Sequence, residues 1–243
     1  MAETSHQKPS LTERVSLLDW HRIEKELDTR GFALTGPLLE VPECKSLVQN
    51  YEEEALYRSH IKMARHGFGR GEYKYYQYPL PGLVSDLRAA IYSHLVPTAN
   101  RWAEALRLET RYPQQLKAYT ERCHAAGQVR PTPLILKYGA GDFNRLHQDL
   151  YGEHVFPLQI AVLLSEPGAQ FSGGEFVITE QRPRMQSHPH VVPLRAGEGV
   201  IFSVNERPVL GSRGYYRAKM RHGVSEVRTG ERHTLGVIFH DAL

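Results

Sequence analysis

Six short apolar runs crowd into the last part of this chain, and no helical segment fits between them. They are PLILKY, FPLQIAVLLS, GEFVIT, HVVPLR, GVIFSV and HTLGVIFH, with clusters of Gly, Pro, Ser and Asn between them. Val, Ile and Phe suit a pleated, half-buried surface, so each run predicts a β-strand. Strands without helices between them do not form a βαβ sheet. Residues 131–240 are therefore expected to form an antiparallel sandwich or a jelly roll.

The first half of the chain shows helical periodicity instead. LLDWHRIEKELDTRG predicts an amphipathic helix with Asp19 as its cap and Gly31 as its stop. A strand is expected to end near Pro37, and a second helix to start near Pro42. LVSDLRAAIYSHLVPTANRWAEAL predicts two helical runs separated by Pro97. The expected fold class is α+β, a C-terminal double-stranded β-helix (jelly roll) with an N-terminal helical layer.

Length and composition favour one domain. A chain of 243 residues can bury a substantial core, and its apolar (41%) and charged (23%) fractions are ordinary. The polar start, residues 1–15, is expected to be a flexible tail. Residues 16–243 are expected to form a single domain, with helical support over 16–128 and a jelly-roll core over 131–240.

Cysteine spacing and hydropathy bear on the location of the protein. Cys44 and Cys123 lie far apart without CxxC spacing, which favours reduced thiols. The start has no apolar run typical of a secretory signal, and no segment approaches the apolar length of a spanning helix. These features predict a cytoplasmic protein without a membrane partner. The formal net charge of +3 permits a polyanionic partner but does not argue for one.

His147 and Asp149, in the stretch NRLHQDLYGEHVF, are candidates for holding a metal ion. In an extended segment residues i and i+2 point to the same face, so the two side chains could chelate one ion. Two polar residues in a turn are the alternative. Imidazole and carboxylate suit Fe(II), Mn(II) or Zn(II), and a third ligand would complete a facial triad. His222 ends an extended run with a return strand soon after, and a β-hairpin there is expected to bring it beside the first pair.

Arg232 and Thr234 alternate onto one face of the strand that continues as LGVIF. A cation among such apolar neighbours is costly unless an anion meets it. A small dicarboxylate would meet this need, since Arg can form a bidentate pair with a carboxylate and Thr can donate one more hydrogen bond.

With these residues in place, the sequence resembles the Fe(II)- and 2-oxoglutarate-dependent dioxygenases. The spacing of ten between His222 and Arg232 is similar to that of the prolyl-hydroxylase-like branch. LKYGAGDFNRLHQD resembles the same branch, as does the Gly-Gly-Glu strand in SGGEFVI. The longer string HQDLYGEHVFPLQIAVLLSEPG, together with TEQRPRMQS, resembles a narrower bacterial family of nucleic-acid oxygenases that act on alkylated bases.

The resemblance implies an enzyme that hydroxylates a substrate carbon and releases succinate and carbon dioxide. Fe(II) would be the cofactor, with 2-oxoglutarate as cosubstrate and dioxygen as oxidant. The iron ligands that it implies are His147, Asp149 and His222. The residues that it implies for 2-oxoglutarate are Arg232, with Tyr138 and Thr234 assisting.

One feature of the sequence favours nucleic acid as the substrate. A basic stripe with few acids near it could follow a line of phosphates. It consists of Arg207, Arg213, Arg217, Lys219, Arg221, Arg228 and Arg232, with Arg182 and Arg184 in a neighbouring segment. Phe68, Tyr75 and Tyr76 could stack a base. A solvated strand face with arginine stems lying on apolar surface is the alternative.

Three functional hypotheses follow from these residues. The first is a dioxygenase that dealkylates damaged nucleic acid by oxidation. The second is a prolyl-hydroxylase-like enzyme acting on a peptide or free amino acid. It gains support because oxidative dealkylases place two arginines further from the distal His than Arg228 and Arg232 stand from His222. The third is a non-catalytic β-helix module that binds a small acid, although such a module needs no ordered set of three ligands.

The remaining candidates have plainer interpretations. His188 and His190 share one face, but Pro189 and its polar neighbours favour a loop or the start of a strand. His154 is expected either near the metal or in a turn. The last two candidates, His240 and Asp241, are expected at the surface. The Gly- and Tyr-rich segment 66–82 is expected to be a surface loop packing tyrosines on the core, with a substrate-binding lid as the functional alternative.

Overall fold

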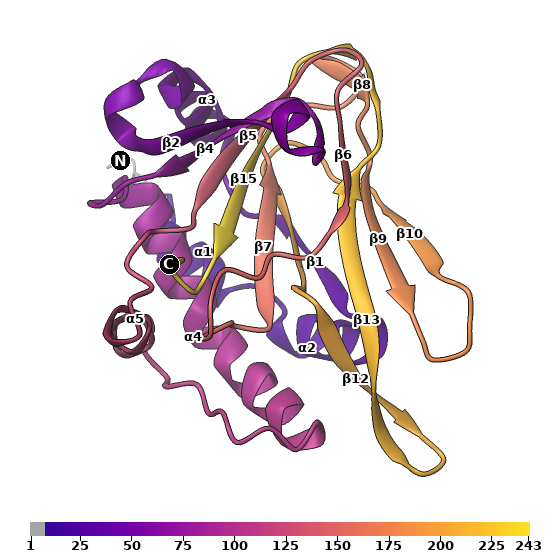
Figure 1. Ribbon diagram of the computed structural model, residues 1–243. Helices are drawn as coiled ribbons and strands as arrows, with labels where there is room; N and C mark the ends of the chain where they lie inside the picture. Colours follow the sequence, from indigo (N-terminus) through magenta and orange to yellow (C-terminus); the bar gives the residue numbers. More distant parts are fainter. Residues whose placement is uncertain (1–7) are drawn as a thin grey trace, which may run out of the picture.

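Two antiparallel sheets face each other in the computed structural model, which describes residues 8–243 (Figure 1). The larger sheet contains seven strands in the order β1-β11-β7-β15-β5-β4-β2, and the smaller contains β10-β9-β13-β6-β3 with β12 added on β13. β8 and β14 form a separate ribbon. This is the jelly roll expected from the sequence. Every pair of named strands is antiparallel, and from β5 to β15 no helix lies between one strand and the next.

The strands of the larger sheet are β1 (Phe32–Pro37), β11 (Glu198–Ser203), β7 (Leu158–Leu163), β15 (Arg232–Ile238), β5 (Leu134–Tyr138), β4 (Glu72–Tyr76) and β2 (Tyr57–Lys62). Those of the smaller sheet are β10 (His188–Val192), β9 (Phe176–Gln181), β13 (Gly214–Val224), β6 (Phe143–His147), β3 (Gly69–Arg70) and β12 (Glu206–Gly211). The ribbon pairs β8 (Phe171–Gly173) with β14 (Val227–Gly230). The helices are α1 (Leu11–Ser16), α2 (Trp20–Arg30), α3 (Val41–Gln49), α4 (Gly82–Ala105) and α5 (Leu116–Ala125), with short 3₁₀ turns η1 (Asn50–Glu52), η2 (Glu54–Leu56) and η3 (Met63–His66).

The chain is helical earlier than its polar composition suggests. The expectation of a flexible tail over 1–15 is wrong for residues 11–15, which lie in α1, and residues 1–7 lie outside the described part of the chain. Ser10 caps α1 through a capping box with Glu13, which satisfies two backbone donors at the helix start. The side chain of Val15 is fully buried in the main core, so packing holds this short helix in place.

The N-terminal half supplies strands as well as helices. β1, β2 and β4 belong to the larger sheet, and β3 pairs with β6 of the smaller one. The surface loop expected over 66–82 is wrong, because Tyr73 and Tyr75 lie in β4, which pairs with β5 of the core. The tyrosine spacing of two residues fits strand alternation, and the glycines that suggested a loop instead serve the tight turns around β3. The caps predicted for α2 are confirmed, since Asp19 accepts from the backbone of Arg22 and Gly31 has φ 79°.

α4 continues through Pro97 as one helix, so the expected break into two runs is wrong. Proline removes the donor that would bind the carbonyl of Ser93 four residues earlier. The side-chain amide of Gln114 donates to that carbonyl at 2.9 Å. The lost helical hydrogen bond is thus replaced from outside the helix, and buried residues before and after the proline pack on the same core.

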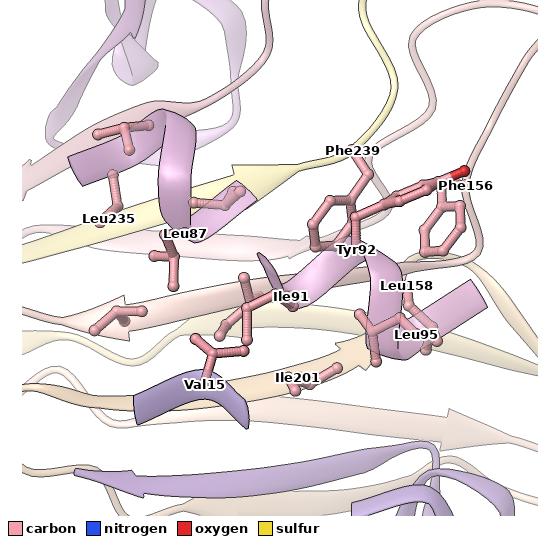
Figure 2. Packing of buried hydrophobic residues seen from close by; sticks show 14 of the residues in the cluster. Val15, Leu87, Ile91, Tyr92, Leu95, Phe156, Leu158, Ile201, Leu235 and Phe239 are labelled. Atoms are coloured by element: carbon pink, nitrogen blue, oxygen red, sulfur yellow. The ribbon is translucent and has the colours of Figure 1, made fainter. Parts of the chain in front are cut away.

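α4 covers the outer face of the larger sheet (Figure 1). Leu87, Ile91 and Leu95 lie on one side of the helix, since they are four residues apart, and they point toward the strands beneath (Figure 2). These three side chains pack with Leu158 on β7 and Leu235 on β15 in one buried cluster. Burying each such side chain contributes roughly 2 kcal/mol. This face of the sheet is therefore closed, and the opposite face is free to shape a cavity.

The C-terminal end of β15 is anchored to α4 by charge. His240 and Asp241 are both fully buried, so the expected surface position is wrong. Asp241 accepts from the Arg88 guanidinium at 2.7 Å and from Tyr78 and His124 at 2.8 Å each. A residue near the chain end is buried here because a cation on α4 neutralises it.

None of the helices within residues 8–243 has the length and hydropathy needed to cross a membrane.

Candidate active site

A cavity of about 390 Å³ lies between the two sheets, and it is lined by every residue that the sequence singled out for metal or cosubstrate binding. Those residues are His147, Asp149, His222, Arg232, Tyr138 and Thr234. They come from four strands and one loop, which only the folded jelly roll brings together.

The pairing of β6 with β13 creates the candidate metal centre. His222 lies directly opposite His147 in the register of these strands, and Asp149 follows β6. The three residues each offer one ligand atom, and these atoms lie within 4.8 Å of one another. The expected hairpin does not place His222, because β14, the strand after β13, pairs with β8 instead. Antiparallel pairing across the sheet, rather than a local turn, positions this residue.

The protonation of the two histidines suits metal binding. His147 Nδ1 lies 2.7 Å from the carbonyl of Arg145, which can only accept, so Nδ1 carries the proton. Its Nε2 is left with a free electron pair and faces Asp149 Oδ1 at 3.6 Å. Burial and the neighbouring His147 lower the pKa of His222, which favours the neutral imidazole that binds a metal.

Asp149 is held as a carboxylate by its surroundings. Burial alone would raise the pKa of Asp149, but the hydrogen bond from His222, together with the one from Gln159, holds it well below its usual range. Tyr151 donates to Oδ1 and Gln159 donates to Oδ2, each at 2.8 Å. These two bonds fix the orientation of the carboxylate, as outer partners of metal ligands do.

The donor set fits Fe(II). Two neutral imidazoles and one carboxylate, converging from one side, form the facial arrangement that leaves other positions free for a cosubstrate and oxygen. A carboxylate facing two histidines without a cation would keep its negative charge buried, which is costly. A divalent ion removes that cost. The residues present therefore fit the metal.

Arg232 marks one end of the cavity and lacks a counter-ion. Its side chain is 1% exposed, its Nη1 donates to the Thr234 hydroxyl at 2.6 Å, and its Nε has no partner among residues 8–243. Burial lowers the pKa of Arg232 to about 10, although Tyr138 and the more distant Glu175 oppose the shift, so the group stays charged at neutral pH. The guanidinium lies over the Tyr138 ring at 5.6 Å. A buried cation in this state fits a ligand carboxylate.

The Gly-Gly pair that precedes β9 leaves room for Arg232. Gly173 and Gly174 have φ values of 72° and 62°, in the left-handed region that side chains disfavour. A Cβ on Gly174 would stand 2.9 Å from Cδ of Arg232 and 2.8 Å from Val227. Gly174 in SGGEFVI therefore leaves the space that the Arg232 side chain occupies.

Apart from Tyr75, the other end of the cavity is built from residues that the sequence did not single out. Tyr73 and Tyr75 on β4, Tyr151 after the metal segment and Gln159 on β7 all line it. The Tyr75 hydroxyl donates to that of Tyr151 at 3.1 Å. Because the Asp149 carboxylate only accepts, the Gln159 amide nitrogen must face it, and Oε1 remains a buried acceptor without a partner in residues 8–243. A lone Gln inside the apolar run FPLQIAVLLS was the available signal, since a buried amide needs a partner.

The two ends are well separated along the sheet. Gln159 pairs with Ile238 on β15, and Arg232 stands six residues earlier on the same strand. At about 3.3 Å per residue this is a separation of roughly 20 Å. Asp149 contacts Gln159 and Tyr151, so the metal ligands reach the end of the cavity away from Arg232. We call this tyrosine-lined end the second compartment.

Several predicted candidates lie outside this cavity. His188 and His190 lie on the edge strand β10, with ring centroids 4.2 Å apart, as the interpretation of a strand position expects. His154 lines a different cavity, beside α4, and its backbone is bonded to Gln128. Tyr76 is fully buried outside the cavity, so its expected stacking role is wrong, whereas Phe68 and Tyr75 line the cavity.

The basic stripe does not form one surface. Arg207 is 1% exposed and is bonded to Glu180 at 2.7 Å, so its role as a phosphate contact is wrong. Arg232 faces the cavity. Arg217, Lys219 and Arg221 are exposed and alternate with inward-facing residues of β13. They therefore lie on the opposite face of that strand from His222.

Solved structures of oxygenases are similar to this chain. The chain aligns with a prolyl hydroxylase from Trichoplax adhaerens, crystallised with a peptide of hypoxia inducible factor, at 14% identity and a TM-score of 0.58, over 99% of this chain and 96% of that one. It aligns with an oxidoreductase of the 2-oxoglutarate–Fe(II) oxygenase family from Burkholderia pseudomallei at 14% identity and a TM-score of 0.51, over 92% of each chain. At these identities the likeness shows the jelly-roll fold alone.

Sequence similarity is more specific. The chain is 48% identical over 164 residues to an uncharacterized protein of Mycobacterium tuberculosis, found in strains H37Rv and CDC 1551, covering 68% of this chain and 70% of that one. A family model matches residues 71–242.

The protein is an Fe(II)- and 2-oxoglutarate-dependent dioxygenase, an oxidoreductase that uses Fe(II), 2-oxoglutarate and dioxygen. Within that class it belongs to the family described as oxygenases catalysing oxidative methylation of damaged DNA. This confirms the enzyme class that the sequence resemblance implied.

Proposed function

We propose that this enzyme oxidises an alkyl group on a damaged nucleic-acid base and thereby removes it. The family description, which names damaged DNA, supports this class of substrate. The cavity supports it too, because next to the metal ligands it is lined by tyrosines, and aromatic rings bind flat bases well.

We propose the following roles for the residues of the cavity. His147, Asp149 and His222 hold Fe(II), which when bound supplies the activation of dioxygen. Arg232 binds the distal carboxylate of 2-oxoglutarate, Thr234 adds a hydroxyl contact, and Tyr138 covers the guanidinium.

The overall reaction balances with these components. One oxygen atom of dioxygen enters a C–H bond of the substrate, and the other enters succinate as 2-oxoglutarate loses carbon dioxide. Each of the two organic molecules supplies two electrons. An N-methyl group becomes N-hydroxymethyl, whose C–N bond then breaks to release formaldehyde, and the nitrogen regains a proton.

The protein positions both molecules and limits water. Tyr151 holds Asp149 in one orientation, and burial and the charge of Asp149 raise the pKa of Tyr151 well above its ordinary value, so its hydroxyl remains a donor. Leu134, Leu136 and Ile238 form an apolar wall of the cavity. An apolar wall near the reacting atoms excludes solvent that would otherwise compete for reactive species.

One observation carries the cosubstrate assignment. Arg232 is a fully buried cation without an acidic partner among the described residues, in the same cavity as three converging metal ligands. A folded protein retains such an arrangement at a cost in stability unless a ligand anion completes it.

Product formation tests the proposal. Succinate and formaldehyde are measured with Fe(II), 2-oxoglutarate and air, in the presence of a methylated single-stranded oligonucleotide, its unmethylated twin or a proline-containing peptide. We expect the methylated strand alone to stimulate succinate and to release equal amounts of formaldehyde. His147→Ala, which removes a metal ligand, should abolish both. Stimulation by the peptide and not by the methylated strand would overturn the nucleic-acid proposal in favour of a prolyl-hydroxylase-like activity.

Two further predictions stand beside this one. The single domain expected over 16–243 is proposed to begin at residue 11 instead, because the largest core cluster draws residues from α1 through Phe239. A cytoplasmic location stays a prediction that rests on Cys44 and Cys123, both buried and unbonded.

A further inference from the structure

A group of exposed basic and apolar side chains lies on segments 62–70 and 145–146, and part of this group lines the cavity. We call it the rim, and it consists of Lys62, Arg65, Phe68, Arg70, Arg145 and Leu146, all of them exposed. Phe68, Arg145 and Leu146 also line the cavity. The sequence contains no acidic residue between Glu54 and Glu72. Among residues 8–243, no carboxylate lies within 4.0 Å of the four rim cations, so their charge is directed to solvent.

The rim is held in a fixed position on β6. Met63 is fully buried between the sheets and anchors η3, which lies near the end of β5 and β6 in Figure 1. The backbone N–H of Arg145 donates to the carbonyl of Phe68 at 2.9 Å. A Cβ on Gly69 would lie 2.2 Å from the carbonyl oxygen of Phe143, so only glycine allows this approach. The rim therefore has a set geometry relative to the strand that carries His147.

Two apolar side chains stand among the rim cations. Phe68 is 48% exposed and Leu146 is 47% exposed. The Phe68 ring stacks on His66 with centroids 5.3 Å apart and planes 23° from parallel. An exposed ring next to cations suits a molecule that is both anionic and aromatic. An acidic peptide would match the charge but not the flat apolar surface.

We propose that the rim binds a single strand of nucleic acid, with its cations on the phosphates and Phe68 stacked on a base beside the one that enters the cavity. The inference rests on the proposed function and adds the surface and the form of the substrate. A base must leave its stack before its alkyl group can reach the metal ligands, and a single strand has already met most of that cost. The strand backbone then remains outside, where the rim lies.

The other exposed basic surface of the β-core is worse placed. Arg217, Lys219 and Arg221 lie on the outer face of β13, away from the cavity. Arg217 is also paired with Glu206 at 3.1 Å. A strand bound there could not present a base to the metal ligands without crossing the sheet. These three residues provide a matched control, since their removal changes the net charge by the same amount as removing three rim arginines.

Salt-dependent binding tests the location. Affinity for a fluorescent single-stranded oligonucleotide is measured by anisotropy against salt concentration for the wild type, for Arg65→Ala/Arg70→Ala/Arg145→Ala, and for Arg217→Ala/Lys219→Ala/Arg221→Ala. Each lost phosphate contact should reduce the log–log salt slope by about 0.7 for a single strand. We expect the rim variant to lose about 2 from the slope and the control variant to keep it. The reverse result, or binding by the wild type that is insensitive to salt, would overturn the inference.

Phe68 tests the stacking separately from charge. Phe68→Ala should weaken binding roughly 5- to 100-fold, the range for loss of one base stack, and Phe68→Trp should restore it. Succinate formation with the methylated strand tests the nucleic-acid substrate and the rim separately. If the methylated strand stimulates succinate formation by the wild type, and the rim variant needs no more of that strand, the rim is rejected and the proposed function is kept. Absence of stimulation in the wild type, with slow succinate formation intact, would reject the nucleic-acid substrate and the rim together.

Discussion

Two arginines are buried equally deeply in this protein, and their surroundings are opposite. Arg88, on α4, is 2% exposed and donates to Asp241, to Tyr78 and to two backbone carbonyls. Burial tends to lower the pKa of Arg88, but Asp241 more than reverses this and raises it. Arg232, at 1% exposed, has no such acid, and its pKa is lowered to about 10.

The difference separates a structural ion pair from a binding site. The fold neutralises Arg88 from within, so that group needs nothing else. It leaves Arg232 without an ion pair among residues 8–243, with an Nε that has no partner there, in the cavity that the candidate metal ligands also line. A buried charge without a counter-charge lowers the free energy of unfolding of the protein until a ligand of opposite charge binds.

Asp241→Asn should give the largest effect and a purely structural one. The change leaves Arg88 buried without a counter-charge, which typically costs about 3 to 5 kcal/mol. Urea unfolding should show this loss. Arg101→Met is the control, because Arg101 pairs with Glu24 and Asp28 at the surface, where such pairs contribute at most about 1 kcal/mol. Equal losses of unfolding free energy in the two variants would contradict the conclusion that the buried Arg88–Asp241 pair stabilises the fold more than a surface pair does.

Arg232→Met should act on the cosubstrate instead. Loss of a bidentate pair with a carboxylate is expected to raise the KM for 2-oxoglutarate about 100-fold or more, with little change in the oligonucleotide requirement. Steady-state succinate formation measures both. Arg228→Met serves as the control, since Arg228 is exposed and lies only near Glu175. A similar rise in that variant would show that general positive charge, rather than the buried group, holds 2-oxoglutarate.

Tyr151→Phe tests the link between the second compartment and the metal. It removes the hydrogen bond to Asp149 while keeping the ring, and loss of such an outer partner typically weakens metal binding about 10- to 100-fold. An anaerobic Fe(II) titration measures this. Tyr75→Phe removes a hydroxyl that reaches only Tyr151, so its effect should be smaller. Equal iron affinity in wild type and Tyr151→Phe would contradict the assignment of Asp149 as a metal ligand.

Gly174→Ala should have the smallest effect. The new Cβ would displace the Arg232 side chain, and we expect a rise of about 3- to 10-fold in the 2-oxoglutarate KM, a cost of roughly 1 kcal/mol. Gly168→Ala is a matched control, because Gly168 also has a positive φ of 79° but a Cβ there would meet nothing within 4 Å. A KM that is unchanged in Gly174→Ala would show that Arg232 does not depend on this glycine.

The sequence predicts which residues meet at the arginine end of the cavity and which two of the candidate metal ligands lie together, because these residues follow local rules. Arg232 and Thr234 share a face by strand alternation, and His147 and Asp149 are two residues apart. Other features depend on pairing between distant segments. The register of β13 on β6 places His222, and no local pattern encodes it.

The second compartment is harder to predict for the same reason. Tyr73 and Tyr75 reach the cavity only because β4 pairs with β5, about sixty residues later in the chain. Asp241 is buried only because α4 brings Arg88 to it. Neither β5 nor Arg88 can be recognised as a partner from the residues near β4 or near Asp241 in the sequence. The polar residues at 240–241 and the tyrosine-rich segment were therefore both expected at the surface.

Equilibrium unfolding of the wild type and Arg232→Met, each with and without 2-oxoglutarate and iron, tests the central claim most directly. A ligand at 100 times its Kd stabilises a protein by about 2.7 kcal/mol. We expect this gain in the wild type and its loss in the variant, which without ligand should be at least as stable as the wild type. A variant that is several kcal/mol less stable without ligand, or that gains the same stability from 2-oxoglutarate, would show that Arg232 is a structural residue.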